Sequence, residues 1–184
     1  MILASRSPRR KHLLKELGFT FDVIPYSDVD EDYPPELKPD QIPVYLARKK
    51  ASGFSEDLDQ NTILITADTI VWYDNRVLDK PKDEADAYRI LKKLSGNMHT
   101  VITGVCLKSA EKEVAFSETT NVYFASLNDK EIDYYLKKFQ PYDKAGAYGI
   151  QEWIGYIGIE KIEGSYFNVM GLPVQKLYVE LKRF

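Results

Sequence analysis

The sequence has few cysteines, little excess charge and no long apolar run, and each absence excludes a class of protein. The single cysteine among 184 residues, Cys106, excludes an internal disulfide. With no apolar signal-peptide core, it indicates a reducing, cytoplasmic setting. No run approaches twenty apolar residues, so we expect no membrane partner. The net charge of −3 argues against a nucleic-acid partner, although it leaves room for a local basic pocket that holds a polyanion.

Histidine is equally scarce. His12 and His99 are the only two, and no zinc site can be assembled from them with Cys106. A Ser-His-Asp or Cys-His nucleophile has little support for the same reason. Neither the Walker A nor the dinucleotide glycine pattern occurs in the chain.

The residues that are present predict a mixed α/β protein with a central sheet and flanking helices. The composition, 44% hydrophobic and 29% charged, is typical of a globular chain that buries a core. Strands are predicted at 1–4, 20–24, 62–67, 70–73, 76–78, 98–109 and 113–126, with one or two more after 141–151 and a tight turn at Asp74-Asn75. Helices are predicted to begin at Pro8, near Asp40, before Ala87, after Asn128 and at Pro173. Ser7 and Asn128 are predicted N-caps, and Gly18 is predicted to end the first helix. No repeat or linker divides the chain, so we expect a single domain over 1–184.

Cationic residues stand at the start of the first predicted helix. Arg9 and Arg10 fall in its first turn, where the helix dipole disfavours positive charge unless an anion binds there. Backbone N–H groups, the Ser5 hydroxyl and a guanidinium could together hold phosphate oxygens. A solvated basic face is the alternative explanation.

Asp68 follows the apolar run 62–67, where a buried strand is predicted to end. Ligands gather at the carboxyl ends of strands in open α/β sheets, so Asp68 is a candidate metal ligand or general base. The alternative is an aspartate that caps a turn. Lys50 and Lys80 would not be singled out by themselves, since such lysines are more often surface residues.

Two loops carry further candidates. The segment 143–151 is dense in small residues, and its Gln151 could read an amide or carbonyl edge; the alternative is a structural loop. The acidic residues at 28 and 30–32 could hold Mg²⁺ through oxygen ligands, although such a loop is usually solvated.

Seven segments in order resemble the Maf family of nucleoside triphosphate pyrophosphatases. They are Leu3 to Arg10, Ala47 to Ala51, Ala67 to Val71, Leu78 to Pro81, Leu94 to His99 with Thr103 to Val105, Asp143 to Gln151 and Gly164 to Pro173. The resemblance implies two lobes about a deep cleft, as in the inosine-triphosphate pyrophosphatase group, and a homodimer. It also implies hydrolysis of a nucleoside triphosphate between its α- and β-phosphates. The residue types Arg10, Thr69 and Gln151 match the branch that acts on dTTP and UTP; modified pyrimidine nucleotides fit the same pattern.

The resemblance also implies roles for single residues. Asp68 matches the proton acceptor, and Glu31 with Asp68 matches a site for a divalent cation, Mg²⁺ or Mn²⁺ with Co²⁺ as a further candidate. The residues that match phosphate-handling positions are Ser5, Arg9, Arg10, Lys50 and Lys80. Asp30 is an alternative to Glu31, because the surrounding loop has few landmarks.

A regulatory function without turnover is the rival interpretation. The family has also been linked to the arrest of septum formation and cell division, and a nucleotide could bind without hydrolysis. Glu31 and Asp68 argue against a bare polyanion ligand, because carboxylates repel phosphate unless a cation bridges them. Gln140 departs from the Glu that many relatives carry there, which argues against an acidic role at that position.

Overall fold

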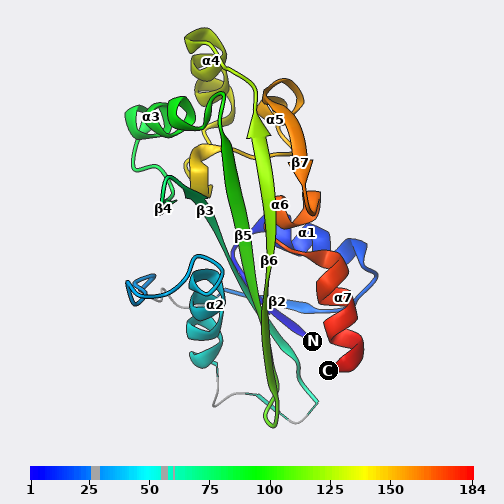
Figure 1. Cartoon of the computed structure of the whole chain (residues 1–184). Helices are drawn as coiled ribbons and strands as arrows, with labels where there is room; N and C mark the ends of the chain where they lie inside the picture. The colour runs from blue at the N-terminus through cyan, green and yellow to red at the C-terminus, as the bar shows by residue number, and fades with distance from the viewer. Residues whose placement is uncertain (26–29, 55–57, 60) are drawn as a thin grey trace. The chain divides into compact units, whose positions relative to one another are not determined.

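The computed structural model describes residues 1–25, 30–54, 58–59 and 61–184, so Asp28 lies outside the described residues (Figure 1). The strands are β1 (Ile2–Ala4), β2 (Asp22–Ile24), β3 (Leu64–Tyr73), β4 (Arg76–Leu78), β5 (Met98–Lys108), β6 (Glu113–Phe124) and β7 (Ile159–Glu163). The helices are α1 (Pro8–Glu16), α2 (Ile42–Ser52), α3 (Glu84–Leu94), α4 (Asp129–Phe139), the 3₁₀ turn η1 (Ala145–Ala147), α5 (Trp153–Gly158), α6 (Tyr166–Met170) and α7 (Val174–Arg183). Within these ranges, every helix is too short or too polar to cross a membrane.

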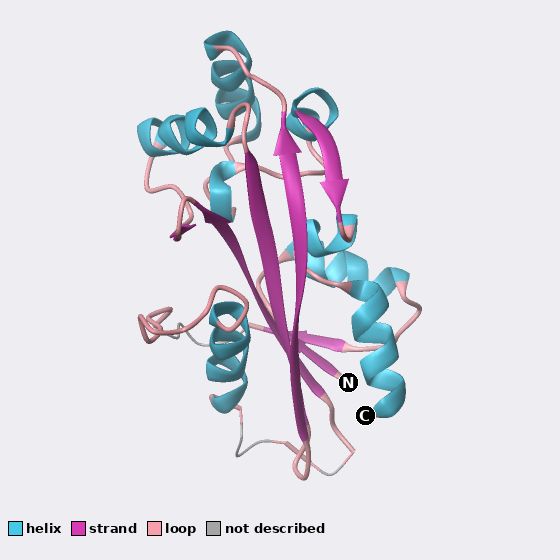
Figure 2. Ribbon diagram, in the orientation of Figure 1, coloured by secondary structure: helices cyan, strands magenta, loops and turns pink. Residues whose placement is uncertain are grey.

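The strands form a mixed sheet, which confirms the predicted α/β class (Figure 2). Their order is β2-β1-β3-β5-β6-β7, and β4 pairs with β3. The strand β1 runs parallel to both β2 and β3, whereas the β3–β4 and β6–β7 pairs are antiparallel. Parallel neighbours need a crossover, and α1 and α2 lie in the connections that follow β1 and β2.

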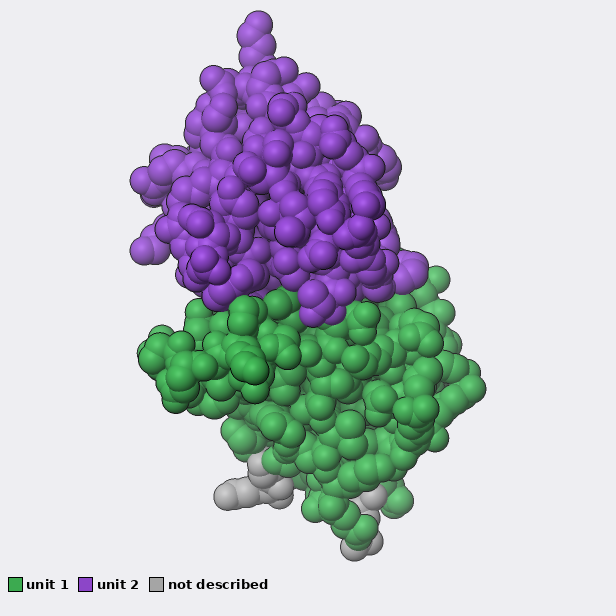
Figure 3. All heavy atoms as spheres, viewed as in Figure 1, with its two compact units in different colours: residues 1–69, 102–118, 171–184 green, residues 70–101, 119–170 purple. Residues whose placement is uncertain are grey.

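The chain divides into two compact units (Figure 3). The first unit comprises residues 1–69, 102–118 and 171–184, and the second comprises 70–101 and 119–170. The long strands β3, β5 and β6 each contribute residues to both units. One apolar cluster of the first unit packs α2 on the sheet through Ala47, Ala51 and Leu64. The core of the second unit includes the inner faces of α3 and α4.

Short-range signals correctly predicted several element ends. The Ser7 side chain accepts from the backbone N–H of Arg10, and Gly18 closes the α1 segment at a φ of +79°. Asn128 forms a full capping box with Glu131 at the start of α4. Asp74 and Asn75 form the tight turn between β3 and β4, both at positive φ.

One sequence-based prediction is wrong, and another is incomplete. The predicted strands 62–67 and 70–73 are one continuous strand, β3, which runs through Asp68 to Tyr73 because β-favouring residues continue beyond the acid and Lys50 pairs with the buried carboxylate. The strand β7 confirms the one or two strands predicted after 141–151, but the helices α5 and α6 were not predicted. Helices of five or six residues are too short for their periodicity to register in the sequence.

Candidate active site

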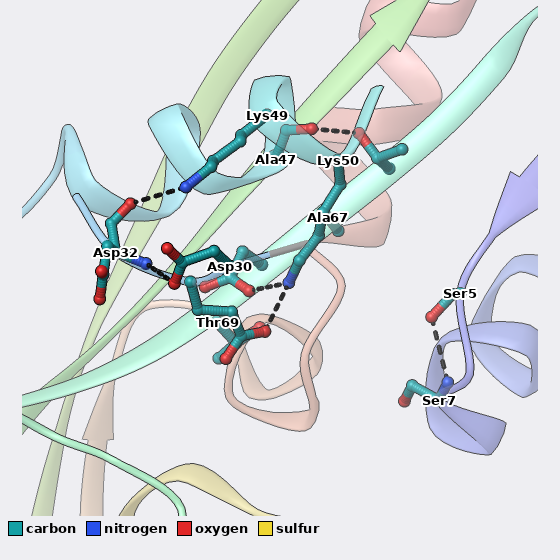
Figure 4. A network of polar contacts seen from close by, with 12 residues as sticks. Ser5, Ser7, Asp30, Asp32, Ala47, Lys49, Lys50, Ala67 and Thr69 are labelled. Atoms are coloured by element: carbon teal, nitrogen blue, oxygen red, sulfur yellow. Dashed lines mark hydrogen bonds and ion pairs between the residues drawn. The ribbon is translucent and has the colours of Figure 1, made fainter. Parts of the chain in front are cut away.

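A lysine on the apolar face of α2 organises the first cluster of polar residues. Leu46, Ala47 and Ala51 bury this face, and Lys50 lies among them with only 3% of its side chain exposed. Its Nζ donates to Glu31 Oε1 at 3.1 Å and to Asp68 Oδ1 over a shorter distance (Figure 4). The structure therefore brings together three residues that come from a loop, a helix and a strand.

Strand alternation places Asp68 on the face of β3 that packs against α2. Thr66, two residues earlier, points the same way and donates to the carbonyl of Ala47 at 2.7 Å. Asp68 is 8% exposed, and its carboxylate meets the Lys50 amine. The pairing fixes this carboxylate in the interior of a strand, where an isolated charge would be costly.

The charge state of Lys50 is decided by competing effects. Burial acts to lower the pKa of Lys50, but the charge and hydrogen bond of Asp68 raise it, with a smaller contribution from Glu31. Arg10 acts in the lowering direction, and the net pKa lies above 10.5. Lys50 is therefore an ammonium group at neutral pH and donates to both carboxylates.

The acidic loop is attached to α2 by two consecutive lysines. Lys49 donates to the backbone carbonyl of Asp32 at 3.2 Å, while Lys50 holds the side chain of Glu31 (Figure 4). The Asp30 carboxylate instead accepts from the backbone N–H of Asp32 at 3.1 Å. Glu31 thus contacts the Lys50–Asp68 pair, and Asp30 stabilises its own turn.

A second cluster lies on the opposite face of β3. All three guanidinium nitrogens of Arg10 donate to the protein: Nε to the carbonyl of Gly171, Nη1 to the carbonyl of Ala67 and Nη2 to Thr69 Oγ1, at 2.8 to 2.9 Å. Thr69 Oγ1 also lies 2.9 Å from Thr103 Oγ1. Arg10 is thus oriented by fixed acceptors and positions the Thr69 hydroxyl.

Two serine hydroxyls accept hydrogen bonds from backbone N–H groups at the start of α1. Ser5 is 4% exposed, and its Oγ accepts from the backbone N–H of Ser7 at 3.1 Å (Figure 4). Ser7 in turn caps the helix. Arg9 is half-buried in the first turn of α1. The strand-to-helix junction is therefore preorganised, with Ser5 at its buried end.

The remaining predicted residues, Lys80 and Gln151, belong to the second unit. Lys80 is exposed and follows β4. Gln151 is half-buried, and its Oε1 is shielded from solvent yet accepts no hydrogen bond from any residue that the structure describes. A buried acceptor without a donor costs free energy, and such atoms are often found where a ligand binds.

The donor set around Lys50 fits a divalent cation. Within the described ranges there is no group of three or more His, Cys, Asp or Glu side chains that could hold a metal by itself. Asp68 and Glu31 nevertheless converge on one ammonium group, and Mg²⁺ usually takes one or two carboxylates and completes its shell with water and phosphate. These two carboxylates are therefore suited to a cation that arrives with a polyphosphate.

Thr103 belongs to this site although sequence reasoning assigned it no role. It lies in β5 with no exposed surface, and its hydroxyl contacts that of Thr69. The available signal was a hydroxyl residue within the otherwise apolar run 101–107 of β5. The corresponding signal for Lys50 was its position, four residues after Leu46 and three after Ala47, which places it on the buried face of the helix.

Comparison with known proteins identifies the family. The model of the family described as "Maf-like protein" matches residues 1–184. A protein of Parabacteroides distasonis called dTTP/UTP pyrophosphatase is 54% identical over 184 residues, covering 100% of this chain and 95% of that protein. A protein of the same name from Flavobacterium johnsoniae is 49% identical over 178 residues, covering 97% of this chain and 91% of the relative. The chain that brings Lys50, Asp68 and Arg10 into this arrangement therefore belongs to the Maf family.

Proposed function

We propose that this protein is a nucleoside triphosphate pyrophosphatase that hydrolyses dTTP and UTP to the monophosphate and pyrophosphate. Modified pyrimidine nucleotides that keep the same base edge are further candidate substrates. Relatives that are about half identical over 91% to 95% of their own length carry the name dTTP/UTP pyrophosphatase, and this supports the assignment.

The observation that carries the proposal is the buried Lys50 ammonium held between the carboxylates of Asp68 and Glu31. Both carboxylates contact the same Nζ atom, so their oxygens converge on one point. Two convergent carboxylates suit a divalent cation that is bound together with a polyphosphate. A cation held by Asp68 and Glu31 would neutralise phosphate charge and so favour attack at phosphorus.

The reaction assigns each residue a defined task. Water attacks the α-phosphorus while the bond from that phosphorus to the α–β bridging oxygen breaks, and pyrophosphate leaves. Asp68 orients the water and accepts its proton. Lys50 fixes the orientation of the Asp68 carboxylate, and Ser5, Arg9 and Lys80 are the proposed partners of the phosphate oxygens.

Base recognition is proposed for Gln151, with Arg10 and Thr69. Uracil and thymine present an N3–H donor beside the O4 acceptor, whereas cytosine presents a bare N3 beside an amino group. The unpartnered Oε1 of Gln151 would accept from N3–H, and its amide nitrogen would donate to O4. This pairing favours uracil and thymine over cytosine, because cytosine would leave the acceptor without a donor.

Three further properties remain proposals from the sequence and the resemblance. They are Mg²⁺ or Mn²⁺ as the cation with Co²⁺ as a further candidate, a homodimeric assembly, and a cytoplasmic location. The location is supported by Cys106, which is a buried free thiol.

The first test measures pyrophosphate release from dTTP, UTP, CTP and the purine triphosphates with Mg²⁺ or Mn²⁺. We expect dTTP and UTP to lead and Asp68→Asn to lower kcat by about 10²- to 10⁴-fold, the usual contribution of a general base. Asp133→Asn, at an exposed carboxylate on α4, is the matched control and should leave kcat unchanged. A nearly native kcat in Asp68→Asn would remove Asp68 from the mechanism.

A second comparison tests base recognition. Gln151→Ala should reduce the preference for UTP over CTP while the protein still releases pyrophosphate. An unchanged preference would contradict the role of Gln151. If the protein binds nucleotides but releases no pyrophosphate from any of them, the regulatory interpretation without turnover replaces the enzymatic one.

A further inference from the structure

Gln151 lies in a tight turn whose two ends are held together. The backbone N–H of Glu152 donates to the carbonyl of Gly149 at 3.0 Å, and this bond closes the turn that contains Gln151. The residues leading into the turn, from Gly146 to Ile150, are all buried. The turn is therefore anchored on its N-terminal side by the core of the second unit.

One side chain on α4 contacts both ends of this turn. The hydroxyl of Tyr135 accepts from the backbone N–H of Gly149 at 3.0 Å and donates to Glu152 Oε2 over a short distance. The side chain of Tyr135 is fully buried. The helix α4, which carries Tyr135, begins in a capping box and is regular to its end (Figure 1).

The Glu152 carboxylate is fixed from a second direction. Lys144 Nζ lies 3.1 Å from Glu152 Oε1, and the side chains of Lys144 and Glu152 are only 10% and 18% exposed. The Glu152 carboxylate lies close to the backbone of Gly149, and a Cβ at Gly149 would lie only 2.8 Å from Glu152 Cδ. Glycine at this position thus allows the carboxylate to pack directly on the backbone of the turn.

The hydroxyl of Tyr135 keeps its proton over the physiological range. Burial, followed by the hydrogen bond to Glu152, raises the pKa of Tyr135 well above its usual range. The phenol therefore remains a donor to Glu152 while its oxygen accepts from Gly149, and both ends of the turn stay attached to one atom.

We propose that Tyr135 is a positioning residue that holds Gln151, through Gly149 and Glu152, in the orientation that reads uracil or thymine. The inference rests on the proposed base-reading role of Gln151. Preorganisation of the turn means that little conformational entropy is lost when the base binds. Neither Tyr135 nor Glu152 needs to touch the substrate for this effect.

The experiment compares Tyr135→Phe with Tyr123→Phe. Tyr123 makes the same kind of bond, to Glu163 Oε2 at 2.7 Å, but on the exposed surface of β6 and β7, so it is a matched control. The readouts are KM and kcat for UTP and CTP, together with hydrogen exchange at the Gly149 amide. Tyr135→Phe should raise KM for UTP by roughly three- to tenfold and lower the UTP-to-CTP preference, with kcat nearly unchanged. Exchange at Gly149 should accelerate, and Tyr123→Phe should behave as the unmodified protein.

The outcomes separate this inference from the proposed function. If Gln151→Ala loses the UTP preference and Tyr135→Phe keeps it, the positioning role is wrong and the base-reading role stands. If Gln151→Ala keeps the preference, both are wrong. Equal losses on UTP and CTP in Tyr135→Phe also overturn the inference, because they indicate a general structural role. Should Tyr135→Phe fail to fold, Glu152→Ala, which removes the acceptor of the Tyr135 hydroxyl, provides the same comparison, with the same direction of change expected.

Discussion

At the scale of single residues, Glu31 and Asp30 are neighbours with different tasks. Glu31 contacts the Lys50 ammonium, whereas Asp30 accepts a backbone hydrogen bond within its own loop. We predict that Glu31→Gln weakens cation binding by roughly tenfold, since the number of anionic ligands tunes affinity for divalent cations. Titration calorimetry with Mn²⁺ and the Mg²⁺ concentration for half-maximal activity both measure the effect.

The neighbouring residue is the control for that prediction. Asp30→Asn keeps a side-chain oxygen for the Asp32 amide and should leave cation affinity nearly unchanged. If Asp30→Asn weakened binding more than Glu31→Gln, the two assignments would have to be exchanged.

His99 gives a second prediction at this scale. It is stacked on Phe124 and hydrogen-bonded through Nε2 to the Tyr148 hydroxyl at 2.7 Å, and burial lowers its pKa from 6.5 to about 3. At pH above 6.5 the histidine is neutral in both the folded and unfolded states. As the pH falls below 6.5, the unfolded state binds a proton that the folded state rejects until about pH 3. The free energy of unfolding should therefore fall by roughly 2 kcal/mol between pH 6.5 and 5 on account of this residue.

Urea unfolding at the two pH values measures this loss. His99→Gln should show a smaller decrease than the unmodified protein, because its side chain does not titrate. His12→Gln replaces the exposed histidine on α1 and should keep the original decrease. An identical pH dependence in all three proteins would contradict the buried neutral state of His99.

At the scale of elements, the packing of α2 against β5 depends on Gly104. A Cβ at this position would lie 2.3 to 2.4 Å from backbone atoms of Pro43 and Val44, which belong to the first turn of α2. We predict that Gly104→Ala lowers the free energy of unfolding by about 1–3 kcal/mol, the usual cost of overpacking. It should also reduce kcat, since α2 carries Lys50. Urea unfolding and pyrophosphate release measure the two effects.

A glycine at the end of α2 provides the comparison. Gly53 is exposed at the C-terminal cap of α2 with a φ of −65°, which alanine adopts without strain. Gly53→Ala should be neutral or slightly stabilising. If Gly104→Ala were equally harmless, close contact with the helix backbone would not be what requires glycine in β5.

Element ends were more predictable than element continuity. Ser7, Gly18 and Asn128 act through contacts within a few residues, and such contacts are visible in sequence. The continuation of β3 through Asp68 depends on Lys50, which lies 18 residues away, and sequence patterns do not record that contact. The short helix α5 was missed because its boundaries depend on the turn that Tyr135 and Glu152 hold together.

At the scale of the whole molecule, the open question is assembly. We predict a homodimer in solution, with a mass of about twice the 21.2 kDa of the chain. Sedimentation velocity across a tenfold or wider range of protein concentration measures it directly. A mass that stays at that of one chain throughout would contradict the prediction.

The order of motifs along the chain was sufficient to identify the family and to nominate candidate catalytic and binding residues. Residue type limits chemistry, so an acid after an apolar run or a glutamine in a glycine-rich loop can be recognised without coordinates. Only the tertiary structure decided that Glu31 contacts Lys50, that all the guanidinium nitrogens of Arg10 bind the protein, and that Tyr135 joins the ends of the Gln151 turn. Each of these depends on side chains from segments distant in sequence, and only folding determines which of them meet.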